Sequence, residues 1–199
     1  MKRIYISKIS LCGLFVLSIL LFGSCTSTET IVVTKAPKPQ IIARGTKPRL
    51  MPAGYLKLQI RKQLPELEEL VINDKNYVYI SKEWFLQMND WTRRFIQEQV
   101  PNLDSKNLPT VYRESYIMFL SSITNFQIAK YYNIKSSALI GILVATNIEP
   151  WGLIPASGEN MSYIIVLSES SMLVYDIVTK QLCKIYDFPN LKHTKKIFF

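Results

Sequence analysis

The side chains that could carry covalent chemistry are few in this sequence. It contains one histidine, His193, and three cysteines, at positions 12, 25 and 183. A thiol or hydroxyl nucleophile needs a base that takes its proton and a third group that orients the base. Because His193 is the only imidazole, a hydrolase would have to pair it with an atypical nucleophile, either Cys183 or Ser115.

Neither pairing suits its surroundings. His193 lies in the charged tail 192–196, a composition typical of a solvated chain end. Cys183 falls within a predicted strand among apolar neighbours, where a thiol packs as a small apolar side chain and its pKa is raised. We therefore expect a protein that is not an enzyme, with the atypical hydrolase as the alternative.

The sequence predicts neither a metal site nor a cofactor. Structural and catalytic metals are held by clusters of His, Cys and carboxylate side chains at ligand spacing. One histidine and few cysteines leave only scattered carboxylates for that role. Phosphate-binding loops need clustered glycines, whereas Gly141 and Gly152 are isolated.

Cys25 points to a different chemistry. It follows a basic start (Lys2, Arg3), an apolar run over 9–22 and small residues at 23–24. These are the marks of a secretory signal peptide. The Gly-Ser-Cys ending resembles the lipobox of bacterial lipoproteins. This resemblance implies that residues 1–24 are removed and that the Cys25 thiol and the new N-terminus carry acyl chains such as palmitate.

A lipidated Cys25 implies a place in the bacterial cell envelope, anchored to a membrane by its N-terminal lipid. In a cell with two membranes this would be the outer membrane. Each buried methylene contributes about 0.8 kcal/mol, so two or three acyl chains hold a protein durably on a bilayer. The alternative is a transmembrane anchor, but the apolar run 9–22 is short of the roughly 20 residues that span a bilayer.

The formal net charge of +9 is concentrated towards the N-terminus. Residues 26–52 combine four prolines with five basic residues and show no sustained periodicity. Proline fixes φ and removes a donor, so we expect 25–52 to form a flexible tether beside anionic lipid headgroups. A nucleic-acid surface needs basic residues clustered with aromatic ones on a folded element. We therefore expect no nucleic-acid partner.

Residues 53–199 are long enough to bury the core of a single globular domain. Apolar residues at helical spacing predict one helix that begins after Ser81 and ends before Pro101, and a second over about 111–131. Period-two and continuous apolar runs then predict strands. The prediction is an α+β domain, two helices followed by an antiparallel meander of about four strands, at 138–145, 162–167, 172–177 and 181–186.

Three further features could contact partners. Trp151 lies between prolines in the loop 149–155, where an aromatic side chain suits contact with a glycan or an envelope protein. The other interpretation of Trp151 is a lid over the core. Glu114 and Ser115, near the start of the second helix, either favour an anion or complement the helix dipole. The apolar end 197–199 forms either a last strand or a partner-binding end.

The order of elements over about 77–186 resembles a papain-like domain found in phage-type and bacterial proteins and at the C-terminal end of a mushroom agglutinin. The segment MSYIIVL (161–167) is similar to the family's histidine strand. The segment LVYDIVT (173–179) is similar to its last strand. The resemblance implies a papain-like fold related to cysteine peptidases.

The catalytic residues of that family do not carry over to this sequence. The nucleophile position falls near Arg113, beside Glu114; the base position falls on Met161, and the orienting position near Asp176. Without an imidazole the usual activation of the nucleophile is lost. The resemblance therefore implies a degenerate member that keeps the fold, acts as a binding or scaffold module, and is non-catalytic.

Overall fold

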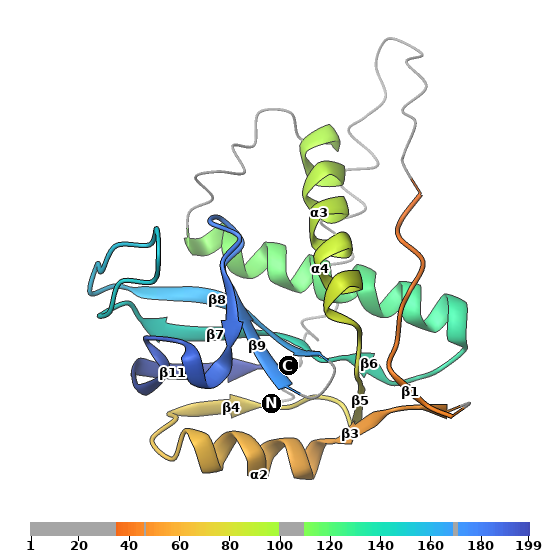
Figure 1. The fold of residues 1–199 in the computed structure, drawn as a ribbon, viewed down its shortest axis with the longest axis horizontal. Coiled ribbons are helices and arrows are strands. Elements are labelled where there is room, and N and C mark those ends of the chain that lie inside the picture. The colour runs from red at the N-terminus through yellow and green to blue at the C-terminus, as the bar shows by residue number, and fades with distance from the viewer. Residues whose placement is uncertain (1–34, 46, 100–109, 169–170) are drawn as a thin grey trace, which may run out of the picture. The chain divides into compact units, whose positions relative to one another are not determined.

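A computed structural model describes residues 35–45, 47–99, 110–168 and 171–199 (Figure 1). The predicted signal peptide 1–24, Cys25 and the first part of the predicted tether lie outside the described residues. The architecture is α+β, as the sequence predicts. Among the described residues, none of the helices combines the length and hydropathy that a bilayer crossing requires.

A six-stranded sheet forms the centre of the domain, in the order β10-β9-β8-β7-β11-β4. The predicted meander is confirmed, because four consecutive strands pair antiparallel. The strand that follows inserts between β7 and β4, antiparallel to the first and parallel to the second. The bounds are β4 Glu69–Val71, β7 Ile140–Thr146, β8 Asn160–Ser168, β9 Ser171–Tyr175, β10 Leu182–Lys184 and β11 Thr194–Phe198.

Alternate residues of the strands enter two apolar cores, one on each face of the sheet. In β8, for example, Tyr163 and Ile165 join one core, whereas Ile164 and Val166 join the other. This alternation follows from the period of two in a strand. It explains why the central strands read as continuous apolar runs in the sequence, since both of their faces are buried.

Two long helices, α3 (Lys82–Gln99) and α4 (Thr110–Tyr132), cover one face of the sheet (Figure 1). The Ser81 hydroxyl accepts a hydrogen bond from the Trp84 backbone N–H at 3.1 Å and so caps α3, which begins after Ser81 as the sequence predicts. The helix α4 ends at Tyr132, and the next residue, Asn133, has a φ of 50° in the left-handed region.

A shorter helix, α2 (Ala53–Gln63), covers the other face (Figure 1). No pattern in the sequence predicts this helix. Its fully buried side chains are Leu56 and Ile60, one turn apart. A small sheet lies beside it, in the order β3-β5-β6, with β3 Leu50–Pro52, β5 Asn76–Val78 and β6 Ser137–Ala138. The strands β1 (Ala43–Arg44) and β2 (Lys47–Pro48) form a separate two-stranded pair.

The described part of the predicted tether differs from an extended, solvated chain. Its backbone joins the domain at Ile42, whose N–H donates to the Tyr79 carbonyl at 2.8 Å, and through the pairing of β3 with β5. The Trp84 indole N–H donates to the carbonyl of Pro37 at 3.3 Å. Long-range hydrogen bonds, rather than local periodicity, therefore order the second half of 25–52.

Candidate functional site

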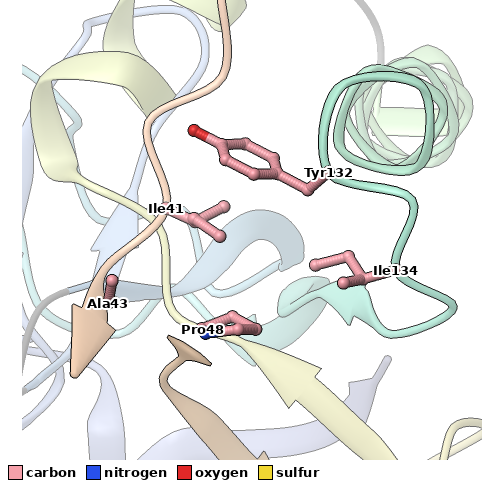
Figure 2. A pocket seen from close by; sticks show the side chains of 5 residues that line it. All are labelled: Ile41, Ala43, Pro48, Tyr132 and Ile134. Carbon is pink, nitrogen blue, oxygen red and sulfur yellow. The ribbon is translucent and has the colours of Figure 1, made fainter. Parts of the chain in front are cut away.

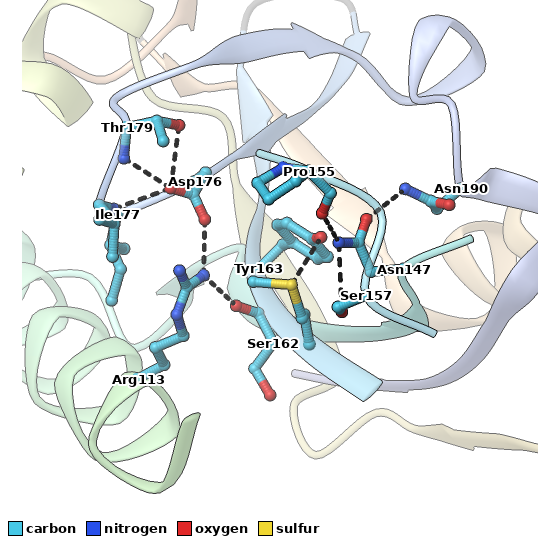
Figure 3. Close-up of polar contacts among 12 residues, drawn as sticks. Arg113, Asn147, Pro155, Ser157, Ser162, Tyr163, Asp176, Ile177, Thr179 and Asn190 are labelled. Atoms are coloured by element: carbon cyan, nitrogen blue, oxygen red, sulfur yellow. Dashed lines mark hydrogen bonds and ion pairs between the residues drawn. The ribbon is translucent and has the colours of Figure 1, made fainter. Parts of the chain in front are cut away.

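Two of the positions inherited from the papain-like resemblance, Arg113 and Asp176, form a buried ion pair. Arg113 lies in the first turn of α4, and Asp176 directly follows β9. The Arg113 Nη1 donates to Asp176 Oδ2 at 2.5 Å, and the two side chains are 8% and 0% exposed (Figure 3). The same nitrogen donates to the Ser162 carbonyl at 3.3 Å. The pair thus joins a helix to the ends of two strands that lie far from it in the sequence.

The second carboxylate oxygen of Asp176 organises the turn that follows β9. Its Oδ1 accepts hydrogen bonds from the backbone N–H of Val178 at 2.9 Å and of Thr179 at 2.7 Å, and from the Thr179 hydroxyl at 3.0 Å (Figure 3). Aspartate commonly bonds the backbone two or three residues on in this way. Both oxygens of the buried carboxylate are therefore occupied by partners within the chain.

Glu114 lies beside the same pair, whereas Met161 packs against the core on the α2 face of the sheet. The Ser162 hydroxyl donates to Glu114 Oε1 at 2.9 Å, so Glu114 reaches β8 next to the strand carbonyl that Arg113 contacts. Met161 is half-buried, and its sulfur accepts from the Tyr163 hydroxyl at 3.6 Å. Burial, with a smaller contribution from the charge of Asp176, raises the pKa of Tyr163 to about 12, while Arg113 acts in the opposite direction.

This arrangement can hold the fold together, but it lacks the parts of an acyl-transfer site. The guanidinium of Arg113 only donates hydrogen bonds, so it cannot act as a nucleophile or a base. Met161, at the base position, has a thioether that cannot accept a proton from a thiol or hydroxyl. Asp176 directs its oxygens to Arg113 and to its own turn.

The alternative nucleophile Cys183 is not brought together with His193. Cys183 lies in β10, whereas His193 ends the 3-10 turn η2 (Leu191–His193) that leads into β11. Three strands separate β10 from β11 in the sheet, and each spacing between neighbouring strands is about 4.8 Å. Burial raises the pKa of the Cys183 thiol to about 11, with a smaller contribution from Asp187. The thiol is therefore protonated and distant from the imidazole.

Ser115, the other alternative nucleophile, is exposed on α4. Within the part of the chain that the structure describes, no hydrogen bond joins it to His193. His193 is half-buried rather than solvated, and it lines a cavity of about 480 Å³. The walls of this cavity carry both signs of charge, including the ion pair between Lys195 and Glu68 at 3.1 Å. The cavity is lined by Glu66, Glu68, Thr146, Ile148, Lys192, His193, Thr194 and Lys195.

Trp151 is a lid over the core and not an exposed partner contact. It is 9% exposed and packs edge-on against Tyr163 and Phe188, with ring centroids 5.7 and 5.2 Å away. Its loop exposes Leu153 instead, at 82%. The expectation of a glycan or protein contact through Trp151 is therefore corrected, because an indole inside this aromatic cluster is closed to a partner.

Two asparagines that the sequence analysis missed hold this loop in place. The Asn190 side chain is fully buried; its Nδ2 donates to Asn147 Oδ1 at 3.1 Å, and its Oδ1 accepts from the backbone N–H of Ile148 and Glu149. The Asn147 Nδ2 donates to the Pro155 carbonyl at 2.6 Å (Figure 3). The two residues are 43 positions apart, so no local pattern signals their contact.

A second hollow lies between the N-terminal segment and the end of α4 (Figure 2). It has a volume of about 240 Å³ and is mostly apolar. It is lined by Ile41, Ala43, Pro48, Tyr132 and Ile134. Over the described ranges, no three His, Cys, Asp or Glu side chains gather into a group that could hold a metal ion.

No family model matches this chain, and no curated protein matches its sequence. A Polyporus squamosus lectin, solved bound to the human-type influenza-binding epitope Neu5Aca2-6Galb1-4GlcNAc, superposes with a TM-score of 0.51 at 7% identity, over 75% of this chain and 49% of the lectin chain. The PSL1a-E64 complex superposes with a TM-score of 0.47 at 10% identity, over 75% and 50%. The chain therefore spans about half the length of the solved structures it matches.

The likeness to the Polyporus squamosus lectin shows a shared fold and nothing more, because only 7% of the residues are identical. It agrees with the part of the sequence resemblance that concerned a mushroom agglutinin. The match covers 75% of the chain. This chain therefore shares its α+β fold with half of a mushroom lectin chain.

Proposed function

We propose that this chain is a lipid-anchored bacterial envelope protein whose papain-like domain is non-catalytic and acts as a binding or scaffold module. The observation that carries the proposal is the buried ion pair of Arg113 with Asp176. It occupies the place where the resemblance expects a nucleophile and its orienting group. Neither Arg113 at the nucleophile position nor Met161 at the base position can take a proton from a nucleophile.

The proposed partner is an envelope protein or a glycan. Support for a glycan comes from the lectin that shares the fold, since that protein was solved with the epitope Neu5Aca2-6Galb1-4GlcNAc. Fold alone does not transfer a ligand, and this chain spans half of the lectin. We therefore propose only the class of partner and do not name an individual one.

We expect the purified chain to release no products from peptides or murein fragments, as measured by mass spectrometry of the supernatant. The reason is that neither Arg113 nor Met161 can activate a nucleophile. A Ser115→Ala variant and a Cys183→Ala variant serve as controls for the two alternative nucleophiles. Hydrolysis that disappears on changing Arg113, Glu114 or Ser115 would overturn the non-catalytic proposal. Hydrolysis lost only in Cys183→Ala would favour the atypical hydrolase.

The lipid anchor is proposed from the lipobox-like ending at Cys25. In a bacterial host fed labelled palmitate, the full chain is expected to take up the label and to sediment with the membranes, at the outer membrane where there are two. Cys25→Ala is expected to lose the label. Cys12→Ala is the matched control, because it removes a cysteine of the apolar run and leaves the acylation position intact. Equal labelling of both variants would contradict the anchor.

A further inference from the structure

The outward side of α4 is uncharged over most of its length. Its exposed residues recur every three or four positions and so lie on one side of the helix. Tyr112, Met118 and Phe126 are 52%, 46% and 63% exposed. We call this side the uncharged face, and its members are Tyr112, Ser115, Met118, Ser122, Phe126 and Ala129.

Its composition is unusual for a helix side that water covers. No charged residue occurs between Glu114 and Lys130, although 20% of the whole chain is charged. The exposed side of a helix in a water-soluble domain ordinarily carries charged and polar residues. One of the two serines is satisfied internally, because the Ser122 hydroxyl donates to the Met118 carbonyl at 2.8 Å. The uncharged face therefore has few side-chain groups that need hydrogen bonds from water.

The N-terminal segment reaches the domain on the helical layer that includes α4. The Tyr132 hydroxyl, at the end of α4, donates to the Pro39 carbonyl at 2.8 Å. In Figure 1 the segment that leads to β1 runs beside this end of the helix. Cys25 precedes Lys35 by ten residues, which span at most about 33–36 Å when fully extended. An anchor at Cys25 would thus hold this side of the domain close to the bilayer.

Basic residues flank the same end of α4. Lys130 is exposed there, and so is Lys38, next to the Pro39 that contacts the helix. An interfacial helix presents apolar and aromatic side chains to the acyl boundary and lysines to anionic headgroups. Apolar exposure, missing charge and flanking lysines all suit a lipid surface better than a charged protein partner.

We propose that the uncharged face of α4 docks on the surface of an anionic bilayer and fixes the orientation of the domain on the membrane. This inference rests on the proposed lipid anchor. It goes beyond that anchor, because attachment at Cys25 alone does not specify which side chains contact the bilayer. Docking would turn the other face of the sheet, which α2 covers, towards the envelope space.

The test uses the full chain, acylated in a bacterial host and reconstituted into vesicles of phosphatidylethanolamine and phosphatidylglycerol. Cys12 and Cys183 are replaced with serine, and an environment-sensitive dye is attached at Phe126→Cys or at Leu58→Cys. Leu58 is the matched control, because it is 69% exposed on α2, over the opposite face of the sheet. Lipids that carry a shallow spin label then quench any dye that sits near the headgroups.

We expect quenching at position 126 to exceed quenching at position 58 by at least about twofold, since interfacial helices sit roughly 5–10 Å deep. Met118→Glu in the position-126 chain should remove the difference. Flotation with equal quenching at both positions would overturn the docking while leaving the anchor intact. A chain that does not float with the vesicles would overturn both proposals. A disulfide cross-link between the position-126 cysteines of two chains in detergent would show that the uncharged face binds a second copy of the chain. That result would also overturn lipid docking.

Discussion

Replacing Arg113 with methionine lowers the free energy of unfolding by about 3–5 kcal/mol, because the change leaves a buried carboxylate without its countercharge. Asp176 is fully buried and depends on the guanidinium for Oδ2. Methionine has a similar length and keeps the apolar contacts of the arginine stem. The decrease in the free energy of unfolding is therefore due to the missing charge and not to a cavity. The measurement is chemical denaturation followed by circular dichroism.

A double-mutant cycle separates this interaction from the rest of the site. Asp176→Asn removes the charge but keeps an oxygen for the N–H groups of Val178 and Thr179. We expect the double variant to be less destabilised than the sum of the two single variants, since it buries no unpaired charge.

The control for the cycle is the exposed ion pair of Lys180 with Asp90, at 3.3 Å with both side chains about half exposed. Exposed pairs contribute at most about 1 kcal/mol. Lys180→Met should therefore change the stability far less than Arg113→Met. Similar effects at both sites would contradict a structural role for the Arg113–Asp176 pair. None of these variants is expected to gain hydrolytic activity, because none introduces a base.

The elements that the sequence predicted are those with strong local periodicity. The long helices α3 and α4 and the four meander strands bury whole faces, so their patterns survive in the sequence. The sequence of α2 lacks the usual features of a helix start. Pro52 at its N-cap makes no side-chain hydrogen bond to the backbone, and its first turn has no acidic residue. The short strands β1 to β3 owe their order to partners elsewhere in the chain.

The candidate site shows the same division. The family pattern pointed to Arg113, Met161 and Asp176. The structure joins Arg113 and Asp176 in a buried ion pair, whereas Met161 packs against the core on the α2 face of the sheet. The family pattern did not predict that pair, because 63 residues separate its members and only folding joins them. Trp151 was misjudged for a related reason. Its flanking prolines signal a loop, but Tyr163 and Phe188, which enclose it, come from distant segments.

Deleting residues 194–199 abolishes cooperative unfolding. These residues form β11, which lies inside the sheet between β7 and β4. Its loss would leave β4 without a strand partner and would open the core around the fully buried Ile197. Domains are stable by only about 5–15 kcal/mol, so losing an interior strand exceeds what the remaining contacts can compensate. Near-UV circular dichroism during denaturation would show a broad, non-cooperative change.

A single substitution in β11 should lower the stability less than the deletion does. Ile197→Ala should cost about 2–5 kcal/mol, as for other large-to-small changes in a core. Leu58→Ala, at a side chain that is 69% exposed, is the matched control and should change stability by about 0.5 kcal/mol or less. An unfolding midpoint of the deletion variant equal to that of the full chain would show that the tail is dispensable.

The docking of the tail also depends on a glycine in the neighbouring strand. A Cβ at Gly141 would collide with the Phe198 carbonyl oxygen and the Phe199 ring. A glycine inside a strand usually weakens it, and it is kept where another backbone approaches closely. Gly141→Val should therefore displace the end of β11 and lower stability in the same way as Ile197→Ala, although its own side chain suits a strand better. If Gly141→Val instead stabilised the protein, the C-terminal residues could not pack against β7 as they do here.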